Sequence, residues 1–129
     1  MSSIIDVSGL TKSFNEIIAV DNLTFTVIEN GVYGFLGQNG AGKSTTIRML
    51  LSLIRPTKGE IRIFGLDLFT HRKEILQRIG AIIEKPDLYK YLTAIENLNL
   101  FATMSGLKLK RKQLKKTFLP YPSTIVFLN

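Results

Sequence analysis

The stretch of residues 37–45, GQNGAGKST, constrains the fold of this chain more than any other feature. It matches G-x-x-x-x-G-K-[ST], a loop whose glycines let consecutive backbone N–H groups turn towards phosphate oxygens, because no Cβ obstructs them. Lys43 is expected to reach the β and γ phosphates of a nucleotide, and Ser44 to offer its hydroxyl to Mg²⁺. A helix that begins there would point the positive end of its dipole at the same anion. The alternative is a glycine-rich turn that matches the pattern by chance.

The segments on either side of the loop supply the context that this motif requires. Residues 32–36 form a short apolar run typical of a strand, and residues 45–53 carry apolar side chains at helical spacing. Strand, loop and helix in that order are the setting of a phosphate-binding loop. We therefore predict that the loop binds a nucleotide through Gly37, Gln38, Asn39, Gly40, Ala41, Gly42, Lys43, Ser44 and Thr45.

The composition limits the class of protein. A chain of 129 residues with 45% apolar residues is of single-domain size, and its sequence has no apolar run near the ~18 residues that a membrane span needs. Six of the seventeen basic residues lie in the acid-free window 108–116, so that segment carries most of the net charge of +7. The first residues lack the basic start and apolar stretch of a signal peptide, and the chain has no cysteine. A cytosolic location is compatible with these features.

The opening of the chain predicts a small, antiparallel β-rich unit. Strands are expected at residues 4–7, 17–20 and 23–27, with a bulge or turn at Ser8 and Gly9 before Leu10. After the loop helix, residues 55–59 have strong turn chemistry.

The later elements are predicted from the same kinds of pattern. A strand is expected at residues 60–64, a turn at 65–67, a short helix at 71–78 and a brief buried strand at 81–83. Thr93 and Glu96 form a capping box that begins a helix, which Gly106 ends. His71, the only histidine, is interpreted as a solvated residue near a helix start, because no second metal ligand lies at ligand spacing.

Four blocks of sequence together resemble the first half of the nucleotide-binding subunit of an ABC transporter: LTKSF with AVDNLTF (residues 10–14 and 19–25), GQNGAGKSTT (37–46), RPTKGEI (55–61) and RIGAIIEKP (78–86). In that family an aromatic side chain from the first block stacks on the adenine ring, and Phe14 holds its position here. Stacking needs only a π face, so Phe can serve where members often have Tyr.

The fourth block resembles the family's Q-loop region, with Glu84 where most members have Gln. The resemblance implies that Glu84 joins Ser44 in the magnesium shell, although its negative charge lies beside the γ phosphate. The alternative for Glu84 is an ordinary surface carboxylate. The spelling from Gly80 through LTAIENL (residues 92–98) resembles the branch that exports bacitracin-like and lantibiotic-like peptides, which implies peptide export or self-immunity.

The resemblance implies an α/β fold: a P-loop NTPase (ABC-type) half-domain over residues 1–107, with an N-terminal antiparallel β subdomain and the start of the helical subdomain. It implies ATP and Mg²⁺ as cofactors, a transmembrane permease subunit as partner, and a cytoplasmic location, peripheral on the inner face of the membrane. Family members dimerise through the nucleotide. The sequence contains neither LSGGQ, nor a Walker B strand, nor the switch histidine. We therefore assign no catalytic residue and expect little or no hydrolysis by this chain alone.

Residues 108–129 form a basic segment in which the family pattern ends. We favour a truncated or frame-shifted gene product. A partly solvated helix of a natural short protein and a surface that binds nucleic acid or anionic lipid are the alternatives, and no aromatic interleaving supports nucleic acid. Residues 125–128 are apolar, with no partner strand that the sequence identifies.

Two other functional classes stay open. The chain could be a non-catalytic fragment that acts only by docking to a transporter subunit, because half of such a domain leaves sheet edges uncovered. It could also be another P-loop NTPase, such as a GTPase or a kinase.

Overall fold

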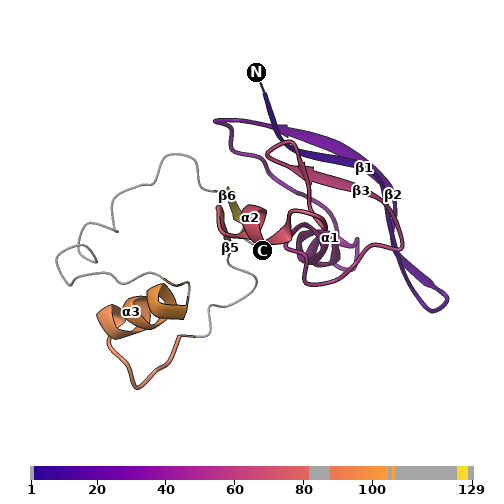
Figure 1. The fold of residues 1–129 in the computed structure, drawn as a ribbon. Coiled ribbons are helices and arrows are strands. Elements are labelled where there is room, and N and C mark those ends of the chain that lie inside the picture. Colours follow the sequence, from indigo (N-terminus) through magenta and orange to yellow (C-terminus); the bar gives the residue numbers. More distant parts are fainter. Residues whose placement is uncertain (1, 82–87, 105, 107–124, 128–129) are drawn as a thin grey trace.

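The structure is a computed structural model that describes residues 2–81, 88–104, 106 and 125–127 (Figure 1). The helices and strands are, in chain order, β1 (Ser3–Phe14), β2 (Ile17–Ile28), α1 (Lys43–Leu50), β3 (Lys58–Ile63), β4 (Leu66–Asp67), α2 (Arg72–Leu76), β5 (Ile79–Ala81), α3 (Ala94–Met104) and β6 (Ile125–Phe127). None of the described helices is both long enough and apolar enough to cross a membrane.

The N-terminal half forms an antiparallel sheet with the strand order β2-β1-β3-β4, which confirms the predicted β-rich unit. The two strands predicted at residues 17–20 and 23–27 are one strand, β2, because the pairing with β1 continues on both sides of an irregularity. Asn22 lies at that irregularity with φ 45°, a left-handed conformation that asparagine tolerates better than most residues.

The predicted bulge at Ser8 and Gly9 is confirmed, and it lets β1 continue to Phe14. The register with β2 shifts between Val7 and Leu10, and Gly9 has φ 58°. On the neighbouring strand Gly59 has φ 93°, and a Cβ there would lie 2.5 Å from the carbonyl oxygen of Gly9. Two glycines therefore allow β1 and β3 to stay together through the bend.

The core lies on one face of this sheet, where α1 and α2 cover it (Figure 1). Alternate residues of β1 and β3 point into it, with Val7 opposite Ile61 and Ile5 opposite Ile63. The buried cluster comprises Ile5, Val7, Leu10, Val20, Met49, Leu50, Ile61, Ile63, Leu68 and Ile75.

The strand predicted at residues 32–36 is wrong, because residues 31–38 have no regular structure. Val32 and Leu36 are almost fully exposed. A strand is stable only when its backbone groups pair with a neighbour, and no strand among the described residues pairs with this segment. The segment therefore leads into the glycine-rich loop without regular structure. The Phe35 ring lies 5.8 Å from that of Phe25, between centroids, and the Tyr33 hydroxyl accepts a hydrogen bond from the Ile28 N–H at 3.2 Å.

Other boundaries differ by a few residues from the predictions. α1 begins at Lys43 and ends at Leu50, and α2 covers only Arg72–Leu76. The predicted turn at 65–67 lies instead at Phe64 and Gly65, because Leu66 and Asp67 pair back onto β3 as β4. Phe64 takes φ 56°, and the guanidinium carbon of Arg78 lies 3.8 Å from the centroid of its ring.

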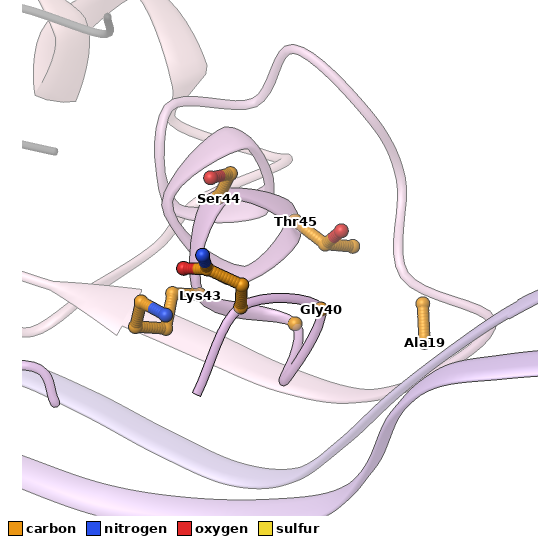
Figure 2. Close-up of a pocket in the computed structure, with 7 residues that line it drawn as sticks. Ala19, Gly40, Lys43, Ser44 and Thr45 are labelled. Atoms are coloured by element: carbon orange, nitrogen blue, oxygen red, sulfur yellow. The ribbon is translucent and has the colours of Figure 1, made fainter. Parts of the chain in front are cut away.

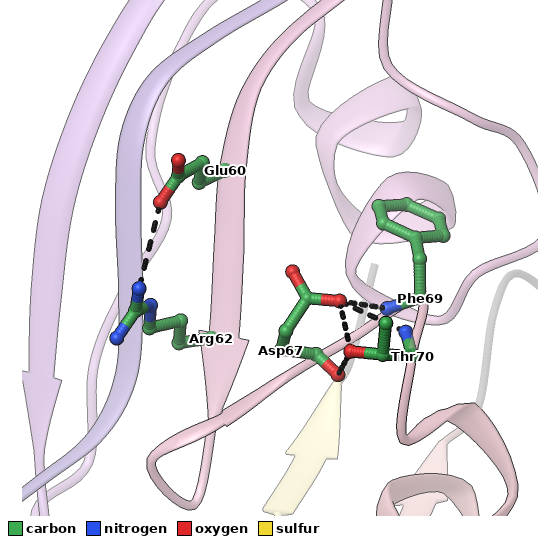
Figure 3. Close-up of polar contacts among 5 residues, drawn as sticks. All are labelled: Glu60, Arg62, Asp67, Phe69 and Thr70. Atoms are coloured by element: carbon green, nitrogen blue, oxygen red, sulfur yellow. Dashed lines mark hydrogen bonds and ion pairs between the residues drawn. The ribbon is translucent and has the colours of Figure 1, made fainter.

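Asp67 ends β4 and shapes the segment that leads into α2 (Figure 3). Its Oδ1 accepts hydrogen bonds from the Thr70 hydroxyl at 2.6 Å, the Thr70 N–H at 2.8 Å and the Phe69 N–H at 3.1 Å. Figure 3 also shows the exposed ion pair between Glu60 and Arg62 at 3.8 Å, which contributes little to stability because solvent screens it.

The capping box before α3 is confirmed. The Thr93 N–H donates to the Glu96 carboxylate at 2.7 Å, and the Glu96 N–H donates to the Thr93 hydroxyl at 3.3 Å. Gly106 has φ 78°, and its N–H donates to the Thr103 carbonyl at 3.0 Å, as expected at the end of the helix.

The C-terminal apolar segment has a partner strand that the sequence did not identify. β6 pairs in parallel with β5, placing Ile79 opposite Ile125 and Ala81 opposite Phe127. Of the strand predicted at residues 81–83 only Ala81 is described; it is exposed, and it belongs to β5.

Candidate nucleotide-binding site

The loop of residues 37–42 ends at the first turn of α1. Gly40 and Gly42 have φ values of 85° and 87°, a left-handed backbone that favours glycine. Gly42 is the N-cap residue, and its carbonyl accepts two hydrogen bonds from Thr46, from the N–H at 2.8 Å and from the hydroxyl at 2.9 Å. Thr46 is only 1% exposed, so this buried side chain fixes the loop to the helix.

Gly42 also touches the neighbouring sheet. A Cβ built on Gly42 would lie 2.3 Å from the carbonyl oxygen of Ala19 and 3.0 Å from Cγ2 of Val20, both on β2. No side chain fits there, so the loop and β2 approach each other because residue 42 is glycine.

The Lys43 side chain folds back over the loop that precedes it (Figure 2). Its Nζ donates hydrogen bonds to the carbonyl oxygens of Gly37 at 2.6 Å and Gln38 at 2.8 Å. The Ala41 N–H donates to the same Gln38 carbonyl at 3.1 Å. These hydrogen bonds close the loop into a ring and keep the Lys43 ammonium against the carbonyls of Gly37 and Gln38.

A cavity of about 480 Å³ opens between this loop and β2 (Figure 2). Its walls combine loop backbone, the first turn of α1 and one residue of β2: Ala19, Asn39, Gly40, Gly42, Lys43, Ser44 and Thr45. None of these lining residues is acidic, and α1, whose residues are all described, has no acidic side chain in its first turn. The ammonium of Lys43 and the positive end of the α1 dipole therefore set the charge of the cavity.

The residues present fit the phosphate groups of a nucleotide. A Cβ on Gly40 would meet no atom within 4 Å, so the absence of a side chain leaves open space beside the cavity. Backbone N–H groups, one ammonium and the hydroxyls of Ser44 and Thr45 are donors of the kind that polyphosphate oxygens accept. A Ser hydroxyl is also a suitable oxygen ligand for Mg²⁺.

Of the ten residues predicted to bind the nucleotide, six line this cavity: Asn39, Gly40, Gly42, Lys43, Ser44 and Thr45. Gly37 and Gln38 hold the Lys43 ammonium through their carbonyls, and Ala41 donates its N–H to the Gln38 carbonyl without lining the cavity. Phe14 does not line it. The ring of Phe14 is 47% exposed at the end of β1, with Nζ of Lys12 lying 4.9 Å from its centroid. The contacts of all ten residues with a nucleotide stay predictions.

The second predicted magnesium ligand, Glu84, lies outside the described residues. His71 occupies the N-cap position of α2 and is exposed, as interpreted from the sequence. The described part of the chain holds no group of three or more His, Cys, Asp or Glu side chains that could bind a metal.

Three residues at or near the site were missed by the sequence-based predictions. Ala19 forms the β2 wall of the cavity, Thr46 anchors the loop to α1, and Lys12 covers the ring of Phe14. Thr46 follows the motif directly, and its place at the helix start was a usable signal. Nothing in the local sequence indicates Ala19, because the loop that it faces lies on another element. Lys12 and Phe14 are two residues apart on β1, but the Arg55 carbonyl that holds the Lys12 ammonium lies 43 residues further along the chain.

Comparison with known proteins agrees with this geometry. The sequence profile of the family described as ABC transporter matches residues 20–122. The chain is 53% identical over 110 residues to the bacitracin transport ATP-binding protein of Bacillus licheniformis, covering 85% of this chain and 36% of the relative. It is 43% identical over 102 residues to the daunorubicin/doxorubicin resistance ATP-binding protein of Streptomyces peucetius, covering 79% and 31%.

A solved structure of the ATP-binding subunit of an ABC transporter superposes with a TM-score of 0.72 at 31% identity, covering 88% of this chain and 46% of that one. The chain spans about a third of the length of the bacitracin and daunorubicin/doxorubicin proteins described above.

Proposed function

The chain belongs to the ABC transporter family, and we propose that it binds MgATP at the cavity beside residues 37–45 as part of the ATP-binding subunit of such a transporter. The observation that carries the proposal is the placement of Lys43 and the start of α1 on one cavity whose described lining residues include no acid. That arrangement favours a polyanion of the size of a nucleotide's phosphate chain.

Each residue has a distinct role in this proposal. The ammonium of Lys43 exchanges one of its carbonyl partners for an oxygen of the β or γ phosphate. Backbone N–H groups of the loop hold the remaining phosphate oxygens, and Ser44 with Glu84 contributes oxygens to the magnesium shell. Bound Mg²⁺ would neutralise part of the phosphate charge. Phe14 stacks on the base.

Titration calorimetry on the 129-residue chain tests the binding. The wild type is expected to bind MgATP, and Lys43→Ala to lose most of the affinity. Lys73→Ala is the matched control, because Lys73 lies on α2 outside the cavity. Equal heats from the wild type and Lys43→Ala would refute the proposal, and a preference for MgGTP would favour another class of P-loop protein.

We expect little hydrolysis from these 129 residues alone. Phosphoryl transfer needs a group that polarises the attacking water and charges that close over the γ phosphate. Among the residues that the structure describes, none that lines the cavity is a carboxylate that could polarise the water. Turnover comparable to that of a complete ATPase, abolished by Lys43→Ala, would contradict this expectation.

The relatives support a proposal for the partner and the cargo. We propose a transmembrane permease subunit as partner, a position on the cytoplasmic inner face of the membrane, and export of or immunity against a peptide antibiotic. The 53% identity to the bacitracin transport protein of Bacillus licheniformis supports a peptide cargo, whereas identities of 38% to a bacitracin transport protein of Enterococcus faecalis and 43% to the daunorubicin/doxorubicin protein do not separate the two cargo classes.

Drug sensitivity of a host strain tests the cargo. Disruption of the gene is expected to raise sensitivity to bacitracin, and the wild-type gene but not Lys43→Ala to restore resistance. Daunorubicin is the comparison drug, and a change in its toxicity without a change for bacitracin would contradict the peptide assignment.

A further inference from the structure

The end of β1 carries a charged side chain packed on the predicted base-stacking ring. Lys12 and Phe14 are two residues apart on one strand, so their side chains leave the same face of the sheet. Nζ of Lys12 lies over the ring of Phe14, 4.9 Å from its centroid, within the range in which an ammonium is attracted to a π face.

The ammonium of Lys12 is itself fixed from a distant part of the chain. It donates a hydrogen bond of 2.8 Å to the carbonyl oxygen of Arg55, in the turn that follows α1. Lys12 is half-buried there, so its long side chain has lost much of its freedom.

The same turn holds the strand on either side of Lys12. The Thr57 N–H donates to the Thr11 carbonyl at 2.8 Å, and the Ser13 N–H donates to the Thr57 hydroxyl at 3.0 Å. Three consecutive residues of β1 are thus bonded to the turn, whereas Phe14, the next residue, is 47% exposed. The ring projects from an anchored strand end, with a cation on one face.

We propose that Lys12 is a positioning residue for base recognition: held on the Arg55 carbonyl, its ammonium fixes the ring of Phe14 so that the opposite face receives the base of the nucleotide. This inference rests on the proposed function, because it gives Phe14 a base to stack on. In this proposal Lys12 affects base binding through the Phe14 ring, whereas the loop and Lys43 bind the phosphates.

The proposal predicts that substitution of Lys12 affects the binding of two ligands differently. MgATP carries a base and a triphosphate, whereas magnesium tripolyphosphate carries only the phosphates, so a defect in base stacking weakens the first and spares the second. Calorimetry of the 129-residue chain with both ligands is expected to show Lys12→Met weakening MgATP about two- to fivefold, the size of an exposed cation–π contact. Binding of tripolyphosphate stays unchanged, and Lys12→Arg keeps the affinity for MgATP because a guanidinium also stacks on a ring.

Phe14→Ala provides the second arm. This substitution is expected to weaken the binding of MgATP. Adding Lys12→Met to Phe14→Ala should then cause no further loss of affinity, because the ring through which Lys12 acts is gone. Lys73→Met, on α2, is the control for the loss of one positive charge.

Four results would overturn the proposal. Equal weakening of both ligands would make Lys12 a general structural or phosphate-binding residue, and tighter MgATP binding by Lys12→Met would mean that the ammonium blocks the face of the base. Thermal melting accompanies each titration; if both Lys12→Met and Lys12→Gln unfold the chain, Lys12 is structural. A wild type that binds neither ligand would refute the proposed function itself, whereas one that binds both and is insensitive to Lys12 refutes only this inference.

Discussion

Gly42 and the carbonyl oxygen of Ala19 are in such close contact that a Cβ on residue 42 would lie 2.3 Å from that oxygen. The glycine before the motif's lysine therefore has two tasks in this fold. It takes the left-handed conformation that starts α1, with φ 87°, and it allows β2 to form a wall of the cavity through Ala19.

Replacing Gly42 with alanine is expected to destabilise the protein. The positive φ alone costs a residue with a Cβ about 1–3 kcal/mol, and the Ala19 carbonyl is backbone that cannot rotate aside. Urea denaturation of Gly42→Ala measures the loss of unfolding free energy. Gly65→Ala is the matched control, because Gly65 has φ 75° and open space around it. Equal losses in the two variants would show that the contact with Ala19 adds nothing.

Asp67 is expected to make the protein acid-sensitive. Hydrogen bonds from the Thr70 side chain and backbone, then from the Phe69 N–H, lower the pKa of Asp67 below its ordinary value of 3.8. A carboxylate whose pKa is lowered by folding adds stability above the unfolded pKa, and that stability is lost as the pH falls through the lower folded value. Below about pH 4 the melting temperature of the wild type should therefore fall more steeply than that of Asp67→Asn.

Melting curves between about pH 5 and pH 3 check this expectation. Thr70→Val removes the hydroxyl that donates to Asp67 and should reduce the same acid dependence. Some dependence should remain in Asp67→Asn, because bonds from Thr93 also lower the pKa of Glu96. Identical slopes for the wild type and Asp67→Asn would contradict the role of Asp67.

The segment of residues 32–36 is expected to behave as exposed apolar surface. Val32 and Leu36 are almost fully exposed, so Val32→Thr with Leu36→Gln should lower concentration-dependent self-association and dye binding while changing stability by less than about 0.5 kcal/mol. Light scattering and urea denaturation measure the two effects. Val20→Thr is the matched substitution at a buried position of β2, where a hydroxyl without a partner costs about 1–3 kcal/mol. A comparable loss from Val32→Thr would mean that Val32 is packed in solution.

Features that depend on neighbours in sequence were predictable. The fold class was confirmed by the family match and the superposed ATP-binding subunit. The capping box of Thr93 and Glu96 formed where local chemistry placed it, because its hydrogen bonds join residues three positions apart. The bulge was indicated by Gly9 itself, which takes φ 58°, although the register shift that it makes is with β2.

Features that depend on a partner far away in the sequence could not be predicted from it. Residues 32–36 have the composition of a strand, yet among the described strands none pairs with them, so composition was a poor guide to their conformation. The sequence analysis found no partner for the segment that forms β6, because its neighbour β5 lies more than forty residues earlier in the chain.

The sequence by itself determined the chemistry of the site: a glycine-rich loop, a lysine, a serine and the start of a helix follow one another within nine residues, and their spacing fixes what they can bind. The tertiary structure alone decided what surrounds that chemistry. It brought Ala19 against Gly42 as a wall of the cavity and placed Lys12 between the Arg55 carbonyl and the ring of Phe14. These contacts join separate elements through the pairing of β1 with β2 and the turn after α1, which no local pattern specifies.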